Sequence, residues 1–115
     1  MASIIAGERS VAQAMKQTIG GAENCRIWAP EPGPIDPEAP AVAELARAFE
    51  QLETLLAGQE CDQILLADDS EEALAAALVA TKLLIEVRAG EAARNPESAN
   101  GRLIAQLAGA YTEPA

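Results

Sequence analysis

Side chains able to do chemistry follow predicted strands at four places in this chain. Arg9 lies at an early strand-to-helix turn, where the amides at the start of the helix would help it to meet a phosphate. Asp69 and Arg88 each lie at or just beyond the end of a short apolar run, and a polar turn from Pro96 to Asn100 opens a later helix. Any binding crevice should therefore lie around Asp69, Arg88 and Asn100.

Each of these residues also has a purely structural interpretation. Arg9 can be a surface arginine. Asp68-Asp69 with Glu71-Glu72 could hold Mg²⁺ through oxygen ligands, or could form a capped and solvated helix start. Arg88 could pair with Asp69 across adjacent strand ends and so form a structural ion pair. The sequence assigns no metal site and no cofactor.

The spacing of apolar residues predicts the elements that position these side chains. Short apolar runs predict strands at 3–6, 25–28, 62–67 and 83–87, with a brief fifth strand at 110–112. Helical spacing predicts helices after residue 9, over 41–57, after residue 70 and after residue 95. Alternating strands and helices form parallel sheets, in which ligands bind beyond the carboxyl ends of the strands. The predicted fold is α/β, a single three-layer domain over residues 1–115 with four to five parallel strands and helices on both faces.

The helix over 41–57 has the clearest amphipathic pattern. Its apolar stripe is Val42, Leu45, Phe49, Leu52 and Leu56. Such a stripe packs on a sheet, or alternatively against a partner helix. The next helix, capped by Ser70, is rich in alanine and so thin enough to approach the sheet or a second copy of the chain closely.

Two further segments have distinct predictions. The segment 30–40 holds five prolines and is expected to be a loop over the strand ends, because proline removes a backbone donor and restrains its predecessor. The last helix is expected to have Asn95 as its cap and Pro96 in its first turn. Its inward stripe is expected to be Leu103, Ile104, Leu107 and Ala108.

Composition limits the possible partners and location. Eighteen acidic and eight basic residues, with no histidine, give a net charge of −10. This charge repels nucleic acid and anionic membranes. The run over 73–85 is interrupted and too short to cross a bilayer, and no signal segment is evident, so a cytoplasmic location is expected. Cys25 and Cys61 are expected to be free thiols, although counting alone leaves a bridge open.

Four motifs in sequence order lead to a family resemblance. The first is a G-T-R-P-E turn, of which Gly7 and Arg9 remain. The second is a strand end G-D-T, in which Asp69 keeps the aspartate, Asp68 replaces the glycine and Ser70 replaces the threonine. The third is H-V-E-A-G-L-R, with Val87, Ala89 and Gly90 kept but Glu86 in place of the histidine and Arg88 in place of the glutamate. The fourth is P-E-E-x-N-R, which retains Pro96, Glu97 and Asn100 and has Gly101 in place of the arginine.

With these motifs the chain resembles the amino-terminal Rossmann-like domain of the non-hydrolysing UDP-N-acetylglucosamine 2-epimerases, most clearly from Cys61 to Tyr111. The resemblance implies a two-domain enzyme that binds a sugar nucleotide between its domains. Such an enzyme moves protons at the second carbon of the sugar while UDP is eliminated and re-added. It also implies that Asp69 and Glu97 are remnants of catalytic carboxylates. The implied substrate-binding residues are Gly7, Arg9, Arg88 and Asn100.

The departures from the family motifs argue against catalysis by this chain alone. Acid–base catalysis contributes about 10²–10⁴-fold, and reversing a charge at such a position, as Arg88 does, should cost more. The expected function is that of a non-catalytic half-domain that self-associates, as a homodimer, or binds a partner. The alternative is a subunit of a split sugar-nucleotide enzyme whose nucleotide-binding domain is on another chain.

Overall fold

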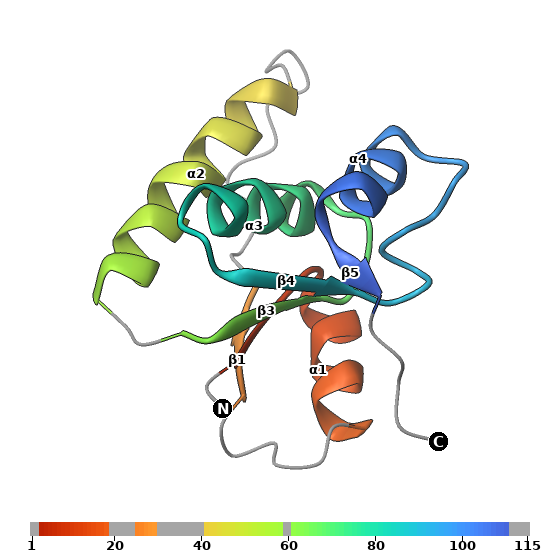
Figure 1. Cartoon of the computed structure of the whole chain (residues 1–115), viewed down its shortest axis with the longest axis horizontal. Coiled ribbons are helices and arrows are strands. Elements are labelled where there is room, and N and C mark those ends of the chain that lie inside the picture. Colours follow the sequence, from red (N-terminus) through yellow and green to blue (C-terminus); the bar gives the residue numbers. More distant parts are fainter. Residues whose placement is uncertain (1–2, 19–24, 30–40, 59–60, 111–115) are drawn as a thin grey trace.

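Strands and helices alternate along the chain in the computed structural model, which describes residues 3–18, 25–29, 41–58 and 61–110 (Figure 1). The strands are β1 (Ser3–Ala6), β2 (Cys25–Trp28), β3 (Gln63–Leu66), β4 (Glu86–Ala89) and β5 (Gly109–Ala110). The helices are α1 (Arg9–Thr18), α2 (Ala41–Gly58), α3 (Glu71–Lys82) and α4 (Ala99–Leu107). Ile19, the proline-rich segment 30–40 and residues 111–112 of the predicted fifth strand lie outside the described residues.

The five strands form one parallel sheet in the order β2-β1-β3-β4-β5. This confirms the predicted α/β fold. The chain leaves β1 toward one edge of the sheet and returns at β3 on its other side, so the strand order reverses between β1 and β3. Ligands of open parallel sheets bind at such a switch point. The loops after β1 and β3 meet there, and the Ala67 amide N–H donates to the Ala6 carbonyl (2.9 Å).

Helices cover the two faces of the sheet unequally. Figure 1 shows α2, α3 and α4 on one face, called here the α3 side, and α1 on the other, the α1 side. Successive strand residues point to opposite faces. Ile64 and Leu66 accordingly belong to the larger core on the α3 side, while Ile5 and Leu65 join a smaller core under α1.

The amphipathic and alanine-rich helices both serve the larger core. In α2, Leu52 and Leu56 are buried, and Leu45 and Phe49 pack against the same cluster. In α3 the buried alanines are Ala73, Ala75, Ala76, Ala77 and Ala80. These small side chains let α3 lie close to the sheet while α2 and α4 contact it from either side. The described part of the apolar stripe is therefore core within this domain.

The predicted fourth strand at 83–87 is wrong in its position, because β4 begins at Glu86. The apolar run before it belongs to the end of α3. The Leu84 N–H donates to the Thr81 carbonyl (3.3 Å) and the Ile85 N–H to the Ala80 carbonyl (2.8 Å), with Leu84 at φ 61°. This is a Schellman cap. Leu83 is 49% exposed and Leu84 is 93% exposed.

The predicted start of the last helix is also wrong. Ser98, not Asn95, is the N-cap of α4, and its Oγ accepts a hydrogen bond from the Gly101 N–H (2.8 Å). Ile104 is fully buried, as expected. Leu103 is 52% exposed, so its predicted inward position is wrong. Within the described residues, no helix is long and apolar enough to cross a membrane.

Candidate functional site

The loops beyond the carboxyl ends of the strands form one hydrogen-bonded edge, called here the carboxyl rim. It comprises residues 7–9, 67–70 and 95–100. Asp68 joins its first two parts: Asp68 Oδ2 accepts the Glu8 amide N–H (2.9 Å) and Asp68 Oδ1 accepts the Ser70 amide N–H (3.1 Å). Gly7, at φ 154°, leaves the room for this contact, since a Cβ there would lie 3.0 Å from Asp68 Oδ1.

Asp69 joins the second and third parts of the carboxyl rim. Its carboxylate accepts hydrogen bonds from Ser98 Oγ (2.6 Å) and Asn95 Nδ2 (3.3 Å). Asn100 Nδ2 donates to the Asp69 main-chain carbonyl (3.1 Å) and to Glu71 Oε1 (3.2 Å). The Ser98 hydrogen bond, with that of Asn95, holds the pKa of Asp69 below its usual range in spite of partial desolvation. The carboxylate is thus kept ionised.

The turn before α4 is held by its own side chains. Asn95 Oδ1 accepts the Glu97 amide N–H (3.0 Å), which explains why Asn95 precedes the helix without capping it. Glu97 itself is exposed. Gly101 packs directly on this turn, because a Cβ at that position would collide with the Asn95 backbone. The turn therefore takes space that a larger residue at position 101 would need.

Arg9 ties the rim to the end of β2. Its Nη2 donates to the Ala29 main-chain carbonyl (2.7 Å), and the contact is partly buried. The predicted site residues Gly7, Arg9, Asp69 and Asn100 are thus brought into one connected set of loops. Each of the three polar side chains among them has a partner within the chain.

Arg88 is not part of this set. It lies within β4, paired in register with Leu65 of β3 and Gly109 of β5, and alternation places it on the α1 side. Arg88 Nε forms an ion pair with Glu86 Oε1 (2.9 Å), and both side chains are about half exposed. The predicted pairing of Arg88 with Asp69 is therefore wrong, since Asp69 is held by Ser98 and Asn95.

The alternative of a Mg²⁺ site receives no support from this geometry. The Asp68 carboxylate accepts from the Glu8 amide, just before α1, whereas the Asp69 carboxylate accepts from Ser98 Oγ, just before α4. In the described residues, no group of three or more acidic or cysteine side chains is placed to hold a metal ion.

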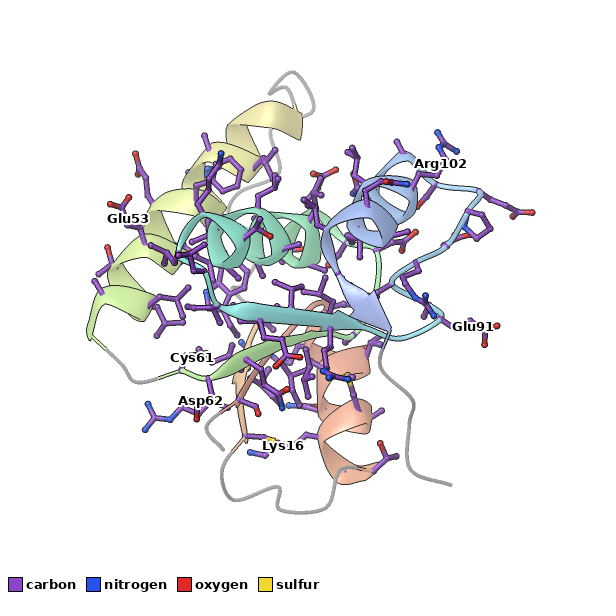
Figure 2. The ribbon with its side chains drawn as sticks, viewed as in Figure 1. Lys16, Glu53, Cys61, Asp62, Glu91 and Arg102 are labelled. Carbon is purple, nitrogen blue, oxygen red and sulfur yellow. The ribbon has the colours of Figure 1, made fainter. Side chains whose placement is uncertain are left out.

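The cysteines lie away from the carboxyl rim. Both are free thiols, as expected, with Cys25 buried and Cys61 half-buried. Figure 2 shows Cys61 beside Asp62 at the amino end of β3. Burial raises the pKa of the Cys61 thiol, which lowers its thiolate fraction and makes it a poor nucleophile.

A groove next to the rim was not predicted. Its volume is about 220 Å³, and it lies between α1 and the ends of β3 and β4. Its lining is Val11, Ala14, Met15, Thr18, Leu66, Ala67, Gly90 and Ala92. Small and apolar residues carry no chemical signal, so only the fold could reveal it. Asp68 was predicted only as a possible Mg²⁺ ligand and Ser98 only as part of a polar turn, because their hydrogen bonds join loops that are distant in sequence.

A parallel sheet in this order, with helices on both faces, defines a Rossmann-like α/β domain. The chain is similar to the UDP-GlcNAc 2-epimerase of Methanocaldococcus jannaschii, at 23% identity and a TM-score of 0.65 over 99% of this chain and 39% of that one. It is also similar to S. aureus MnaA in its structure with UDP, at 17% identity and a TM-score of 0.65 over 94% of this chain and 36% of that one.

These similarities establish the fold that the sequence resemblance implied. The chain spans less than two-fifths of the length of either structure, which is consistent with a half-domain of such an enzyme. No family model and no curated protein matches the chain by sequence.

Proposed function

We propose that this chain is an epimerase-like half-domain that has no catalytic activity of its own and serves as a self-association or partner-binding module. The observation that carries the proposal is the state of the carboxyl rim. Asp68, Asp69, Arg9 and Asn100 are hydrogen-bonded to the chain itself, where a working crevice would keep such groups for a ligand.

The chemistry of the two remnant positions supports the same conclusion. A general base needs to reach the proton that it abstracts and to have a pKa near the working pH. Hydrogen bonds lower the pKa of Asp69, which makes it a weaker base. Arg88, in place of a family carboxylate, carries a guanidinium, which has no acceptor site for a proton and so cannot serve as a general base, and it pairs with Glu86.

The α1 side of the sheet is the surface that we expect a partner to use. Among the described helices only α1 lies on this side, where it packs against β1 and β2. On the same side, β4 carries the half-exposed ion pair of Glu86 and Arg88. The 220 Å³ groove between α1 and the ends of β3 and β4 lies beside Gly90. The α3 side, by contrast, already has three helices over it.

Light scattering after size exclusion, over micromolar concentrations, tests this proposal. We expect the chain to form a homodimer, or else to bind one defined protein recovered by pull-down. Arg88→Glu should weaken that association, since it places two like charges on the proposed surface. Arg47→Glu, on the exposed face of α2, is the matched control and should not. A strict monomer with no partner recovered would contradict the proposal.

A split sugar-nucleotide enzyme is the second candidate. The observation that favours it is the contact between Asp69 and Asn100, two positions retained from the family motifs, at the carboxyl rim. One of the similar structures contains UDP. In this case UDP-N-acetylglucosamine should bind only when a separate nucleotide-binding chain is present. No heat and no change in melting temperature, with or without that chain, would eliminate this candidate. For either function we expect a cytoplasmic location, because the sequence shows no evident signal segment and no apolar run long enough to cross a bilayer.

A further inference from the structure

Asn100 and Gly101 form an asparagine–glycine pair in the first turn of α4. Asparagine is a chemically labile residue, and it is most reactive before glycine, which has no side chain to obstruct the backbone nitrogen. That nitrogen attacks Cγ of the asparagine and forms a new N–Cγ bond in a succinimide ring. The Cγ–Nδ2 bond breaks, and the side-chain amide leaves as ammonia with the proton of the glycine nitrogen. Water then opens the ring to aspartate or isoaspartate.

The glycine of this pair is required by the packing of the carboxyl rim. A Cβ at residue 101 would lie 2.7 Å from the Asn95 backbone nitrogen and closer still to the Asn95 carbonyl oxygen. A residue with a side chain does not fit there unless the turn moves. The residue that makes Asn100 reactive is therefore the one that lets the turn before α4 lie against the helix.

Hydrogen bonds of the closed rim engage both reacting groups. Asn100 Nδ2 donates to the Asp69 carbonyl (3.1 Å) and to Glu71 Oε1 (3.2 Å), which fixes the direction of the carboxamide. The Gly101 N–H donates to Ser98 Oγ (2.8 Å). For the attack, the Gly101 nitrogen must lose its proton and Cγ of Asn100 must turn toward it. The reaction therefore requires these hydrogen bonds to open first.

Either product would lack contacts that hold the rim together. Aspartate at residue 100 has no N–H to donate to the Asp69 carbonyl, and it places a second carboxylate beside Glu71. Isoaspartate carries the chain through its side chain and so lengthens the backbone by one methylene group within the first turn of α4. That change moves the Gly101 N–H away from Ser98. Both products thus weaken the connection of α4 to the loop after β3.

We propose that Asn100 is a deamidation site that the closed carboxyl rim protects, and that its conversion leaves the rim open. The loss of ammonia makes the change irreversible, so a transient opening becomes a permanent covalent one. This inference goes beyond the proposed function, since it holds whether or not the chain has a partner.

Peptide mapping by mass spectrometry, with isoaspartate detection, tests the protection. The chain is incubated at mildly alkaline pH, folded and in guanidinium chloride. Asn95 is an internal reference, because Pro96 has no N–H and cannot supply the attacking nitrogen. Ser98→Ala removes the acceptor of the Gly101 N–H. Ser10→Ala is the matched control, because Ser10 is exposed on α1 and its hydroxyl donates to Glu8.

Residue 100 should convert at least about tenfold more slowly in the folded chain than in the denatured one, the effect of a hydrogen bond to a charged group. Ser98→Ala should raise the rate in the folded chain about fivefold, since a helix cap is worth about that factor, and Ser10→Ala should not change it. Equal rates in the folded and denatured chains would overturn the proposal, as would equal rates in Ser98→Ala and wild type.

Hydrogen exchange of the converted chain, separated by its extra negative charge, tests the open rim. The Gly101 amide should exchange at least about tenfold faster than before conversion, while Ile5 in β1 keeps its protection. Unchanged protection at Gly101 would overturn this part of the proposal. So would an equal loss at Ile5, because the conversion would then unfold the chain as a whole. None of these results bears on dimer or partner formation, which light scattering measures separately.

Discussion

Gly101 packs directly against the Asn95 backbone near the carboxyl rim. Its ideal Cβ position lies 2.7 Å from the Asn95 backbone nitrogen and closer still to the Asn95 carbonyl oxygen. The resembled family has arginine at this position of its motif. The turn from Asn95 to Ser98 can fold against α4 here because that side chain is missing.

Gly101→Ala should therefore destabilise the chain by about 2–3 kcal/mol, since the added methyl group meets backbone atoms that cannot move independently. Urea denaturation measures the change. Gly58→Ala is the matched control, because a Cβ at Gly58 has no atom within 4 Å. It should be neutral or stabilising by less than about 1 kcal/mol. Equal effects of the two substitutions would show that Gly101 is not close-packed on the turn.

Asp69 should make stability depend on pH in the acid range. Its pKa is lowered in the folded chain, chiefly by Ser98, so folding favours the ionised carboxylate. That contribution is fully present above the pKa of aspartate in the unfolded chain, about 3.9, and is lost as the pH falls through the lower folded pKa. Asp69→Asn should reduce the loss of stability below about pH 4. Thermal unfolding followed from neutral to acid pH checks this.

Ser98→Ala should have a related effect, since it removes the main hydrogen bond to Asp69 and also the cap of α4. Its cap alone is worth about 1 kcal/mol, so stability should fall at neutral pH as well. If the stability of the Asp69→Asn variant instead fell with acid pH as steeply as that of wild type, the result would contradict a lowered pKa for Asp69.

At the scale of elements, the end of α3 carries an unusual residue. Leu84 occupies the left-handed position of the Schellman cap, where glycine is usual, and is 93% exposed. A non-glycine residue in this conformation costs about 1–2 kcal/mol. An exposed leucine recovers little of that by burial.

Leu84→Gly should thus stabilise the chain by about 0.5–1 kcal/mol, the relief of strain minus the flexibility that glycine adds to the unfolded chain. Leu83→Gly is a close control, because Leu83 has φ −90°, so glycine relieves no strain there, and its side chain is less exposed than that of Leu84. That substitution should destabilise. Melting temperatures of the two variants on opposite sides of wild type would confirm the cap, and a lower value for Leu84→Gly would contradict it.

The elements also show what sequence could and could not predict. β1 and β2 were predicted to the residue, because each is a short apolar run bounded by turn residues. β4 was misplaced by about three residues, since Leu83 and Leu84 look like strand residues while in fact they end a helix. The start of α4 was misplaced because Asn95 and Pro96 resemble a cap. The hydrogen bond from the Gly101 N–H to Ser98 Oγ shows that Ser98 begins the helix.

The candidate site was predicted in outline. Parallel strands bring their carboxyl ends together, so the proximity of Asp69 and Asn100 followed from the predicted parallel sheet. Arg88 lies within the sheet and not at the rim, because the strand predicted to end at residue 87 in fact extends to Ala89. Asp68 was distinguished from Asp69 only by standing where the resembled family has glycine, and nothing in the sequence indicated its hydrogen bond to the Glu8 amide.

At the scale of the whole molecule, two features coincide. The carboxyl rim is joined across β2, β1, β3 and the loop after β4 by hydrogen bonds that Arg9 and Asn100 donate and that Asp68 and Asp69 accept. The α3 side of the sheet is covered by three helices and the α1 side, in the described residues, by one (Figure 1). In the described residues, the polar groups of the rim therefore have partners within the chain, and the α1 side carries fewer helices than the α3 side.

The most direct test of the proposal that this chain has no catalytic activity of its own follows the hydrogen at the second carbon of the sugar. The chain is incubated with UDP-N-acetylglucosamine in D₂O, and the signal of that proton is followed by NMR, with the M. jannaschii epimerase as the positive control. The account predicts no loss of the proton signal with the chain alone. Exchange at a rate proportional to the concentration of the chain, and abolished by Asp69→Asn, would contradict it.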